Sequence, residues 1–319
     1  MRPRVRVLCL PDVDRPIGGV KQLYRHVEHL VDLGWDAAMV TEAAGFRPSW
    51  FRSDAPALSL AECAQRGELT ANSTLLLLPE TYLGVDLRSF RGLDLSSLAK
   101  VVFNQNGYYT YGQVGETLDD QLQRFYDDPS VLQVLSISED THTLLQRNLG
   151  LSDQRLSRII NAIEPTFRSD QPAENRLHWM PRKNPQEVQA VLMGIQRAGL
   201  QHSAGWQGEP LQGLSHDQVA DRLNGARLFL SFGHPEGFGL PIAEAMAAGC
   251  WVVGYSGGGG RELFRFGASE AVAFGDWPTF VAAVQRALTA FAEQPRETEF
   301  RLQRQALAVR SLYSHDQER

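Results

Sequence analysis

Short apolar runs alternate with amphipathic stretches along most of this chain. Runs bounded by glycine, proline or polar residues are typical of buried parallel strands, and in the first half we expect them at residues 5–10, 37–41, 75–78, 101–103 and 131–137. After the first run, apolar residues recur at helical spacing: Val20, Leu23, Tyr24, Val27, Leu30 and Val31. The alternation of strand and helix through about residue 160 predicts a doubly wound parallel α/β sheet.

The second half repeats this alternation. Strands are expected at residues 177–180, 227–231 and 251–253, and helices from about Gln186, over 215–224, over 241–248, from about Arg261 and from Pro295. Ser215 is a suitable N-cap, and Gly249 a suitable stop for the 241–248 helix. We expect residues 158–165 to form the last strand of the first half and then a hinge, marked by Pro165.

Composition narrows the class of protein. The chain has 319 residues, of which 43% are hydrophobic, a length that allows two ordinary domains. A net charge of -6 argues against a protein that coats nucleic acid. Cys9, Cys63 and Cys250 show no metal-ligand spacing, so we expect buried thiols in a reduced, cytoplasmic protein. No apolar stretch is long enough for a signal peptide or a membrane span, which leaves room only for peripheral membrane contact.

The segment from His234 to Val253 carries the strongest chemical signal. Gly237 and Gly239 let the backbone approach a ligand closely, and the helix that follows offers free N–H groups to a phosphate. Glu236 lies in the loop and Glu244 about one turn into the helix, so both carboxylates can bind hydroxyls of one elongated polyol. Acidic residues also occur near helix N-termini simply because they interact favourably with the helix dipole. That explanation does not account for two glycines, a proline and both acids in the same segment.

Two further loops are expected to contribute to a phosphate site. Arg182 and Lys183 follow a strand, and their charges can neutralise a diphosphate. Gly18 and Gly19 open the first helix with bare backbone N–H groups. Each loop taken alone is also typical of ordinary solvated surface or of a tight turn.

Two other kinds of site are disfavoured. A nicotinamide site would need Gly-x-Gly-x-x-Gly, and only the Gly18-Gly19 pair is present. Asp12 and Asp14 lie in the first loop, beside a place meant for a phosphate, and we expect them to be solvated loop acids. No metal and no cofactor are therefore predicted.

The loop at residues 104–111 interleaves amides with aromatic rings. Gln105, Asn106, Tyr108 and Tyr109 offer hydrogen bonds and flat apolar faces, the combination that binds sugars. We expect this loop to form the acceptor side of the site, although a packed aromatic loop is equally typical for any one of the tyrosines.

The His234–Val253 segment resembles the Glu-seven-residue-Glu motif of retaining nucleotide-sugar glycosyltransferases of the GT-B fold (glycosyltransferase group 1, family 4-like). The resemblance rests on the Glu-Gly-Phe-Gly core, the Glu-Ala-Met-Ala-Ala-Gly helix and the Val-Val strand, all in register. It implies that Glu236 contacts the donor sugar and Glu244 the ribose. It also implies that Lys183 and Arg182 lie at the diphosphate. The rest of the donor site would be formed by Gly18, Gly19, Gly237, Phe238, Gly239 and Leu240.

The resemblance also implies two Rossmann-like domains that face a central cleft. Residues 1–162 would form the acceptor-side domain, 163–295 the donor domain, and 296–319 a helix that returns to the N-terminal domain. Several positions depart from the family pattern. Asn106 stands where many members have a catalytic His, Ala162 replaces a glycine of the interdomain segment, Trp251 replaces a proline, and only 52 residues separate Lys183 from Glu236, so the second domain is reduced.

The sequence therefore predicts a retaining, metal-independent glycosyltransferase that moves a sugar from a nucleoside diphosphate sugar to a glycan, lipid or small-molecule hydroxyl. The main alternative is a non-catalytic sugar-nucleotide or glycan binding protein of the same fold. An epimerase or phosphorylase on this fold is a weaker alternative. The nucleotide base, the sugar, the acceptor and the oligomeric state are not predicted.

Overall fold

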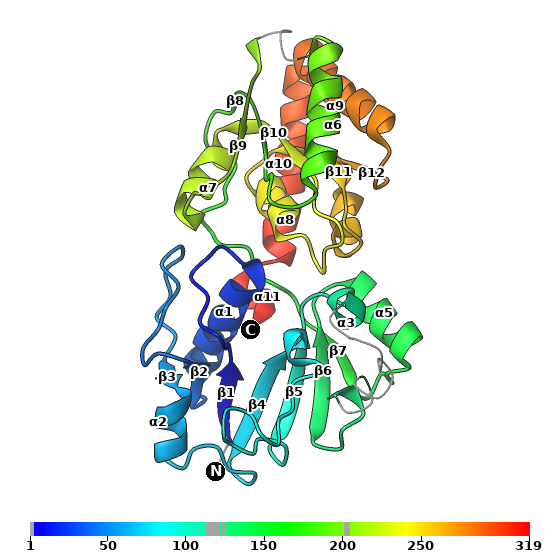
Figure 1. Ribbon diagram of the computed structural model, residues 1–319. Helices are drawn as coiled ribbons and strands as arrows, with labels where there is room; N and C mark the ends of the chain where they lie inside the picture. The colour runs from blue at the N-terminus through cyan, green and yellow to red at the C-terminus, as the bar shows by residue number, and fades with distance from the viewer. Residues whose placement is uncertain (1–2, 113–121, 123–124, 201–204) are drawn as a thin grey trace. The chain divides into compact units, whose positions relative to one another are not determined.

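The computed structural model describes residues 3–112, 122, 125–200 and 205–319. The chain divides into two compact units, Met1–Ile159 with Arg319, and Ile160–Glu318. Each unit is an α/β fold built on a parallel sheet (Figure 1). The two Rossmann-like units confirm the predicted fold class.

The first unit has a seven-stranded parallel sheet in the order β3-β2-β1-β4-β5-β6-β7. Its strands are β1 (Arg4–Leu8), β2 (Ala37–Thr41), β3 (Ala57–Ser59), β4 (Thr74–Pro79), β5 (Ala99–Asn104), β6 (Val131–Ser136) and β7 (Leu156–Arg158). Its described helices are α1 (Gly18–Asp32), α2 (Leu60–Gln65), the 3-10 turn η1 (Glu80–Tyr82), α3 (Tyr109–Gly112) and α5 (Glu139–Leu149).

Local sequence signals set the helix ends of this unit. Ser59 caps α2 in a capping box with Glu62, and Ser138 accepts a hydrogen bond from the Thr141 N–H at the start of α5. Gly150 ends α5 in the left-handed conformation. The strands between these helices bury leucine and valine side chains in one continuous core, which includes Leu8, Val40, Leu76, Leu78, Val102 and Val134.

The second unit has a five-stranded parallel sheet in the order β12-β11-β10-β8-β9. Its strands are β8 (Glu174–Trp179), β9 (Gln207–Pro210), β10 (Ala226–Ser231), β11 (Trp251–Tyr255) and β12 (Glu270–Val272). Its described helices are α6 (Pro185–Arg197), α7 (His216–Asn224), α8 (Leu240–Ala247), the 3-10 helix η3 (Gly259–Phe266), α9 (Trp277–Glu293), α10 (Pro295–Leu312) and α11 (His315–Glu318). Ser215 caps α7 in a capping box with Gln218, as predicted.

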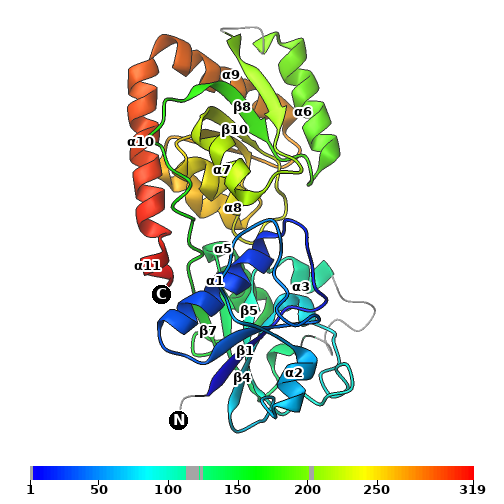
Figure 2. The same cartoon turned by 90° about the vertical axis from the view of Figure 1, so that its left-hand side faces the viewer.

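The long C-terminal helix belongs to the second unit. This helix, α10, packs on α8 and α9, as Figure 2 shows, and Arg319 is grouped with the first unit. The return of the tail 296–319 to the N-terminal domain, which the resemblance implies, stays a prediction. Two hydrogen bonds fix the position of α10: Gln305 donates to the Cys250 carbonyl at 3.3 Å, and Arg310 to the Ala247 carbonyl at 2.7 Å.

Two predicted elements differ from the structure. The strand expected at 158–165 ends at Arg158, because the chain then leaves the sheet and the Ile163 N–H donates to the Tyr313 carbonyl at 2.8 Å. The helix expected from Arg261 is a 3-10 helix that begins two residues earlier, at Gly259, where close contact with a neighbouring loop fixes the backbone.

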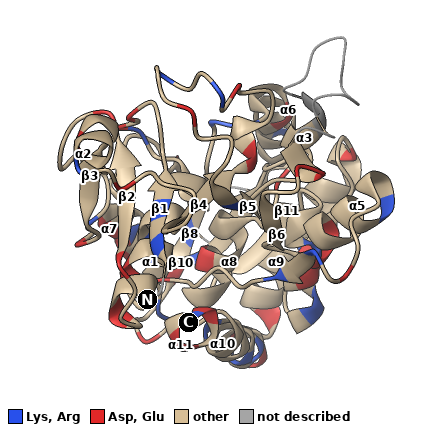
Figure 3. Ribbon diagram, turned by 90° about the horizontal axis from the view of Figure 1, so that it is seen from below, with Lys and Arg blue, Asp and Glu red and all other residues tan. Residues whose placement is uncertain are grey.

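Three general expectations can be compared with this fold. None of the helices in the described part of the chain combines the length and apolarity that crossing a bilayer requires. Both α5 and α10 carry acidic and basic residues (Figure 3), with the acids in the first half of each helix. Cys9, Cys63 and Cys250 are all free and buried, which confirms the expected burial.

Candidate functional site

The strongest predicted residues lie at the switch point of the second sheet. β8 is the first strand of this unit, and its neighbours β9 and β10 lie on opposite sides of it. In doubly wound sheets, ligands bind beyond the carboxyl ends of the strands at such a reversal. Lys183 follows β8 and Glu236 follows β10, so both predicted residues lie where this rule places a ligand.

Lys183 and Glu236 form an ion pair. The Lys183 Nζ lies 2.7 Å from Glu236 Oε1 and also donates to the Pro235 carbonyl at 3.3 Å. About one-fifth of each side chain is exposed, 23% for the lysine and 19% for the glutamate. The pair thus places a cation and a carboxylate together at the surface of the switch point, where a diphosphate and sugar hydroxyls could each find a partner.

Asn184 holds the two loops of this pair together. Its side-chain amide donates to the carbonyls of Phe232, at 2.7 Å, and His234, at 3.0 Å. Its backbone is left-handed, with φ of 51°, where it caps α6 ahead of Pro185. The sequence motif did not identify Asn184, because its partners are 48 and 50 residues away.

The backbone of Glu236 is fixed by a glycine-rich loop after β11. The Glu236 N–H donates to the Gly257 carbonyl at 2.7 Å, and the Gly259 N–H donates to the Glu236 carbonyl at 3.0 Å. A Cβ on Gly257 would lie 2.6 Å from the Cβ of Glu236, and a Cβ on Gly259 only 1.9 Å from the Gly237 carbonyl oxygen. Glycine is therefore required at positions 257 and 259 by the close approach of the two loops.

Glu244 is paired with a histidine from another helix. It lies on α8, 5% exposed, and its Oε1 is 3.0 Å from the His216 Nε2 at the start of α7. The imidazole packs edge-on against Phe167, with ring centroids 5.1 Å apart. His216 is thus a further residue of this site, and the 28 residues between it and Glu244 hide the pair from a local motif.

The other predicted donor residues differ in exposure. Gly239 is left-handed, with φ of 85°, and caps α8, which begins at Leu240, so Pro241 is its second residue and not its first. Phe238 is only 2% exposed and packs on Tyr313, so its ring belongs to the packed interior of the unit. Gly237 is buried as well, whereas Arg182 is exposed.

The first unit has its own switch point, between β1 and β4. Gly18 and Gly19 begin α1, directly after the loop that follows β1. A Cβ on Gly19 would lie 3.1 Å from the side-chain oxygen of Gln105. The structure therefore brings the predicted glycine pair and the predicted amide loop together within one unit.

The amide and aromatic loop after β5 is largely engaged in its own hydrogen bonds. The Asn106 side chain is 5% exposed and accepts from the Tyr108 N–H at 3.2 Å. The Tyr108 hydroxyl donates to Asp140 at 2.6 Å. Tyr109 is 39% exposed. Of these three residues, Tyr109 presents the most surface to a ligand.

Glu80 is a buried carboxyl that the sequence pattern did not reveal. It follows β4 at the switch point, is 3% exposed, and accepts the Gln105 N–H at 2.9 Å. Burial raises its pKa to about 7, although hydrogen bonds from the backbone of Gln105, Asn106 and Glu80 itself act in the opposite direction. Its carboxylate holds the start of the amide loop in place.

The raised pKa of Glu80 predicts a pH-dependent stability. Because the folded pKa lies above the ordinary 4.5, the contribution of Glu80 is fully present below pH 4.5 and is lost as the pH rises through about 7. We expect Glu80→Gln to remove about 3 kcal/mol of this pH dependence. Urea unfolding of both proteins at pH 4.5 and 8 measures it, and equal pH dependence in the two would contradict the assignment.

The acids of the first loop have a structural role. Asp12 accepts the N–H groups of Glu42 and Ala43 at 2.8 and 2.9 Å, and Asp14 accepts the Ser49 N–H at 2.6 Å. These exposed carboxylates therefore hold the loop after β2.

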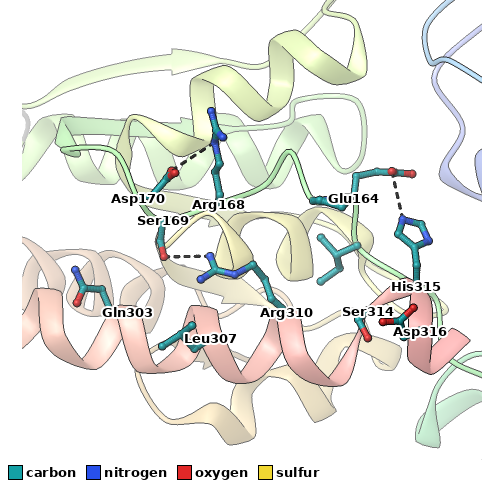
Figure 4. A pocket seen from close by; sticks show the side chains of 12 residues that line it. Glu164, Arg168, Ser169, Asp170, Gln303, Leu307, Arg310, Ser314, His315 and Asp316 are labelled. Carbon is teal, nitrogen blue, oxygen red and sulfur yellow. Dashed lines mark hydrogen bonds and ion pairs between the residues drawn. The ribbon is translucent and has the colours of Figure 1, made fainter.

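A separate cavity of about 620 Å³ lies between the segment after Ile163 and the helices α10 and α11 (Figure 4). Its charged side chains pair among themselves: Arg168 with Asp170 at 3.4 Å, and His315 with Glu164 at 3.4 Å. It contains none of the predicted donor or acceptor residues.

Part of the chain is similar in sequence to known glycosyl transferases. Residues 195–300 match the family model of glycosyl transferases group 1, a stretch that includes Glu236 and Glu244 but not Lys183. An alpha-1,6-glucosyltransferase of Actinobacillus pleuropneumoniae serotype 7 (strain AP76) is 33% identical over 84 residues. That alignment spans 25% of this chain and only 26% of the relative.

Solved structures resemble the chain over almost its whole length. HepE from Anabaena, in complex with UDP and glucose, has a TM-score of 0.71 at 13% identity, over 99% of this chain and 96% of its own. Sucrose-phosphate synthase from Thermosynechococcus elongatus has a TM-score of 0.69 at 13% identity, with the same coverage. The chain thus has two Rossmann-like domains, the fold of GT-B glycosyltransferases. Its residues 195–300 match the model of glycosyl transferases group 1.

Proposed function

We propose that this chain is a retaining glycosyltransferase that transfers a hexose from a nucleoside diphosphate sugar to an acceptor hydroxyl. The observation that carries the proposal is the Lys183–Glu236 pair at the switch point of the second sheet. A sugar nucleotide offers a diphosphate for the cation and hydroxyls for the carboxylate. The group 1 match over residues 195–300 supports it, and the named relatives favour a UDP-sugar such as UDP-glucose.

The residues divide the work of the reaction. Glu236 would accept hydrogen bonds from the sugar hydroxyls and Glu244, oriented by His216, from the ribose. Lys183 and Arg182 would stabilise the negative charge that develops on the diphosphate as it leaves, and Gly18 and Gly19 would add backbone N–H groups. Gln105, Tyr108 and Tyr109 would contact the acceptor, and Asn106 would position their loop.

The proposed step needs neither an enzyme nucleophile nor a metal. The acceptor oxygen bonds to the anomeric carbon on the face from which the diphosphate departs. The bond from that carbon to the diphosphate oxygen breaks, and the acceptor proton passes to this oxygen. The anomeric configuration is thereby retained. The fixed charge of Lys183 favours this step because it stabilises the leaving group more than the bound donor.

A non-catalytic sugar-nucleotide binding protein is the second candidate, and Asn106 is the observation that favours it. Its amide cannot transfer protons, and its side-chain oxygen already accepts the Tyr108 N–H. If this candidate is correct, the protein binds a nucleotide sugar without releasing the nucleoside diphosphate.

One experiment separates the candidates. Thermal shifts are measured with UDP-, GDP- and ADP-sugars, since a ligand at 100 times its dissociation constant adds about 2.7 kcal/mol of stability. Release of nucleoside diphosphate is then followed for the donor that binds, with a panel of acceptors, and with and without EDTA. We expect binding, release that EDTA does not affect, and an axial product linkage by NMR from an axial donor. The absence of a shift with every donor would reject the proposal.

A further inference from the structure

Three aromatic rings gather beside the Glu236 loop in the second unit. The His234 imidazole, two residues before Glu236, stacks on Phe274 with ring centroids 4.3 Å apart and planes 19° apart. Trp277 begins α9, three residues after Phe274. Phe274 is 49% exposed and Trp277 43%, so the cluster presents large apolar faces to solvent.

Hydrogen bonds and ring contacts hold this exposed cluster in place. The carboxylate of Glu187, in the first turn of α6, accepts two hydrogen bonds. One comes from the Trp277 indole N–H at 2.7 Å and the other from the Tyr255 hydroxyl. Tyr255 packs edge-on against Phe274, with centroids 5.1 Å apart, and its hydroxyl is hydrogen-bonded by the backbone of Gly275. Both exposed aromatics are therefore fixed before any ligand arrives, which lowers the entropic cost of binding.

We propose that the exposed face of Phe274, backed by the stacked His234 ring and followed along the chain by Trp277, forms an aromatic platform that stacks on the hexose ring of the nucleotide-sugar donor, an inference that rests on the proposed function. Pyranose rings have an apolar face of C–H groups and an equatorial belt of hydroxyls. A site with flat rings on one side and a carboxylate on the other matches both features.

The position of His234 identifies the donor hexose as the occupant. His234 and Glu236 share the loop after β10, and Glu236 is the side chain proposed to bind donor hydroxyls. The His234 carbonyl accepts a hydrogen bond at 3.0 Å from Asn184, the residue after Lys183, which places His234 beside the ion pair. Desolvation is the largest influence and lowers the pKa of His234, so at neutral pH the ring is uncharged and offers an apolar face.

The test compares a nucleotide with its sugar ester. The affinities of the protein for UDP and for UDP-glucose are measured by calorimetry for the wild type, Phe274→Ala and Phe274→Tyr. If another sugar nucleotide gives a larger thermal shift than UDP-glucose, that sugar nucleotide and its nucleoside diphosphate are used instead. We expect Phe274→Ala to lower the affinity for the sugar nucleotide about three- to tenfold and to leave the affinity for the nucleoside diphosphate unchanged. Phe274→Tyr, which retains the ring, should restore wild-type affinity.

Controls keep this outcome separate from failure of the proposed function. Phe300→Ala removes another exposed phenylalanine, 59% exposed, from α10 and should leave both affinities unchanged. Phe274→Leu keeps an apolar side chain without the flat ring and should behave like the alanine variant. An unchanged ratio of the two affinities in Phe274→Ala and Phe274→Leu overturns the platform. Absence of any nucleotide-sugar binding by the wild type rejects the proposed function itself.

Discussion

Glu236→Gln is expected to lower turnover about 100-fold or more while leaving the fold intact. The amide keeps the shape of the carboxylate but loses the charge-assisted hydrogen bonds to sugar hydroxyls, worth about 1.5–3 kcal/mol each. The partly exposed pair with Lys183 contributes little to stability, because such ion pairs are worth about 1 kcal/mol or less. Initial rates of nucleoside diphosphate release and a thermal melt measure the two effects.

A matched substitution elsewhere in the unit provides the control. Glu270 pairs with Arg286 at 2.6 Å on the same sheet, and Glu270→Gln removes a comparable ion pair outside the candidate site. Its turnover should equal that of the wild type. Wild-type turnover in Glu236→Gln would contradict the donor-site assignment. A melting temperature of this variant many degrees below that of the wild type would show that Glu236 has a structural role instead.

The second large effect is expected from Gly259→Ala. The added Cβ would lie 1.9 Å from the Gly237 carbonyl oxygen and 2.7 Å from the Phe238 nitrogen, and both are backbone atoms that no rotamer change can move. The loop must shift, which breaks the hydrogen bond from Gly259 N–H to the Glu236 carbonyl. We expect a loss of about 3 kcal/mol in the free energy of unfolding, together with loss of donor binding.

Gly225→Ala is the control for this substitution. Gly225 ends α7 with φ of −97°, which alanine adopts without strain, and the nearest atom to a new Cβ is 3.8 Å away. Its stability should stay within about 0.5 kcal/mol of the wild type. Denaturant unfolding and calorimetry with the nucleotide sugar measure both variants. If Gly259→Ala and Gly225→Ala have equal stability and bind the nucleotide sugar equally well, neither property depends on the close approach of the Glu236 loop and the glycine-rich loop after β11.

The central strands were predictable because their residues are buried on both faces. The apolar runs of β2, β4 and β10 are continuous and punctuated by polar or turn residues, so each was recognised near its observed bounds. The edge strands β9 and β12 were not recognised. Gln207–Pro210 is mostly polar and Glu270–Val272 is three residues long, so neither carries a periodic signal.

The candidate site was predictable only where its residues lie in one segment. Glu236 and Glu244 belong to a single loop and helix, whereas the partners of Asn184, Glu244 and Glu80 lie 25 to 50 residues away along the chain. Such pairs follow from strand order, which local patterns do not specify. The glycine run after β11 was visible in the sequence, but its reason, the approach of a second backbone, is a tertiary feature.

The burial of the three cysteines makes this chain a convenient background for site-directed labelling. Desolvation raises the pKa of Cys9 and Cys63 to about 11 and that of Cys250 to about 12, so their thiols stay protonated and slow to react at neutral pH. A single cysteine introduced at an exposed position such as Leu307 or Leu132 will therefore take up a maleimide dye selectively. Pairs of such dyes allow single-molecule fluorescence to follow changes of conformation in the protein without removing any native cysteine.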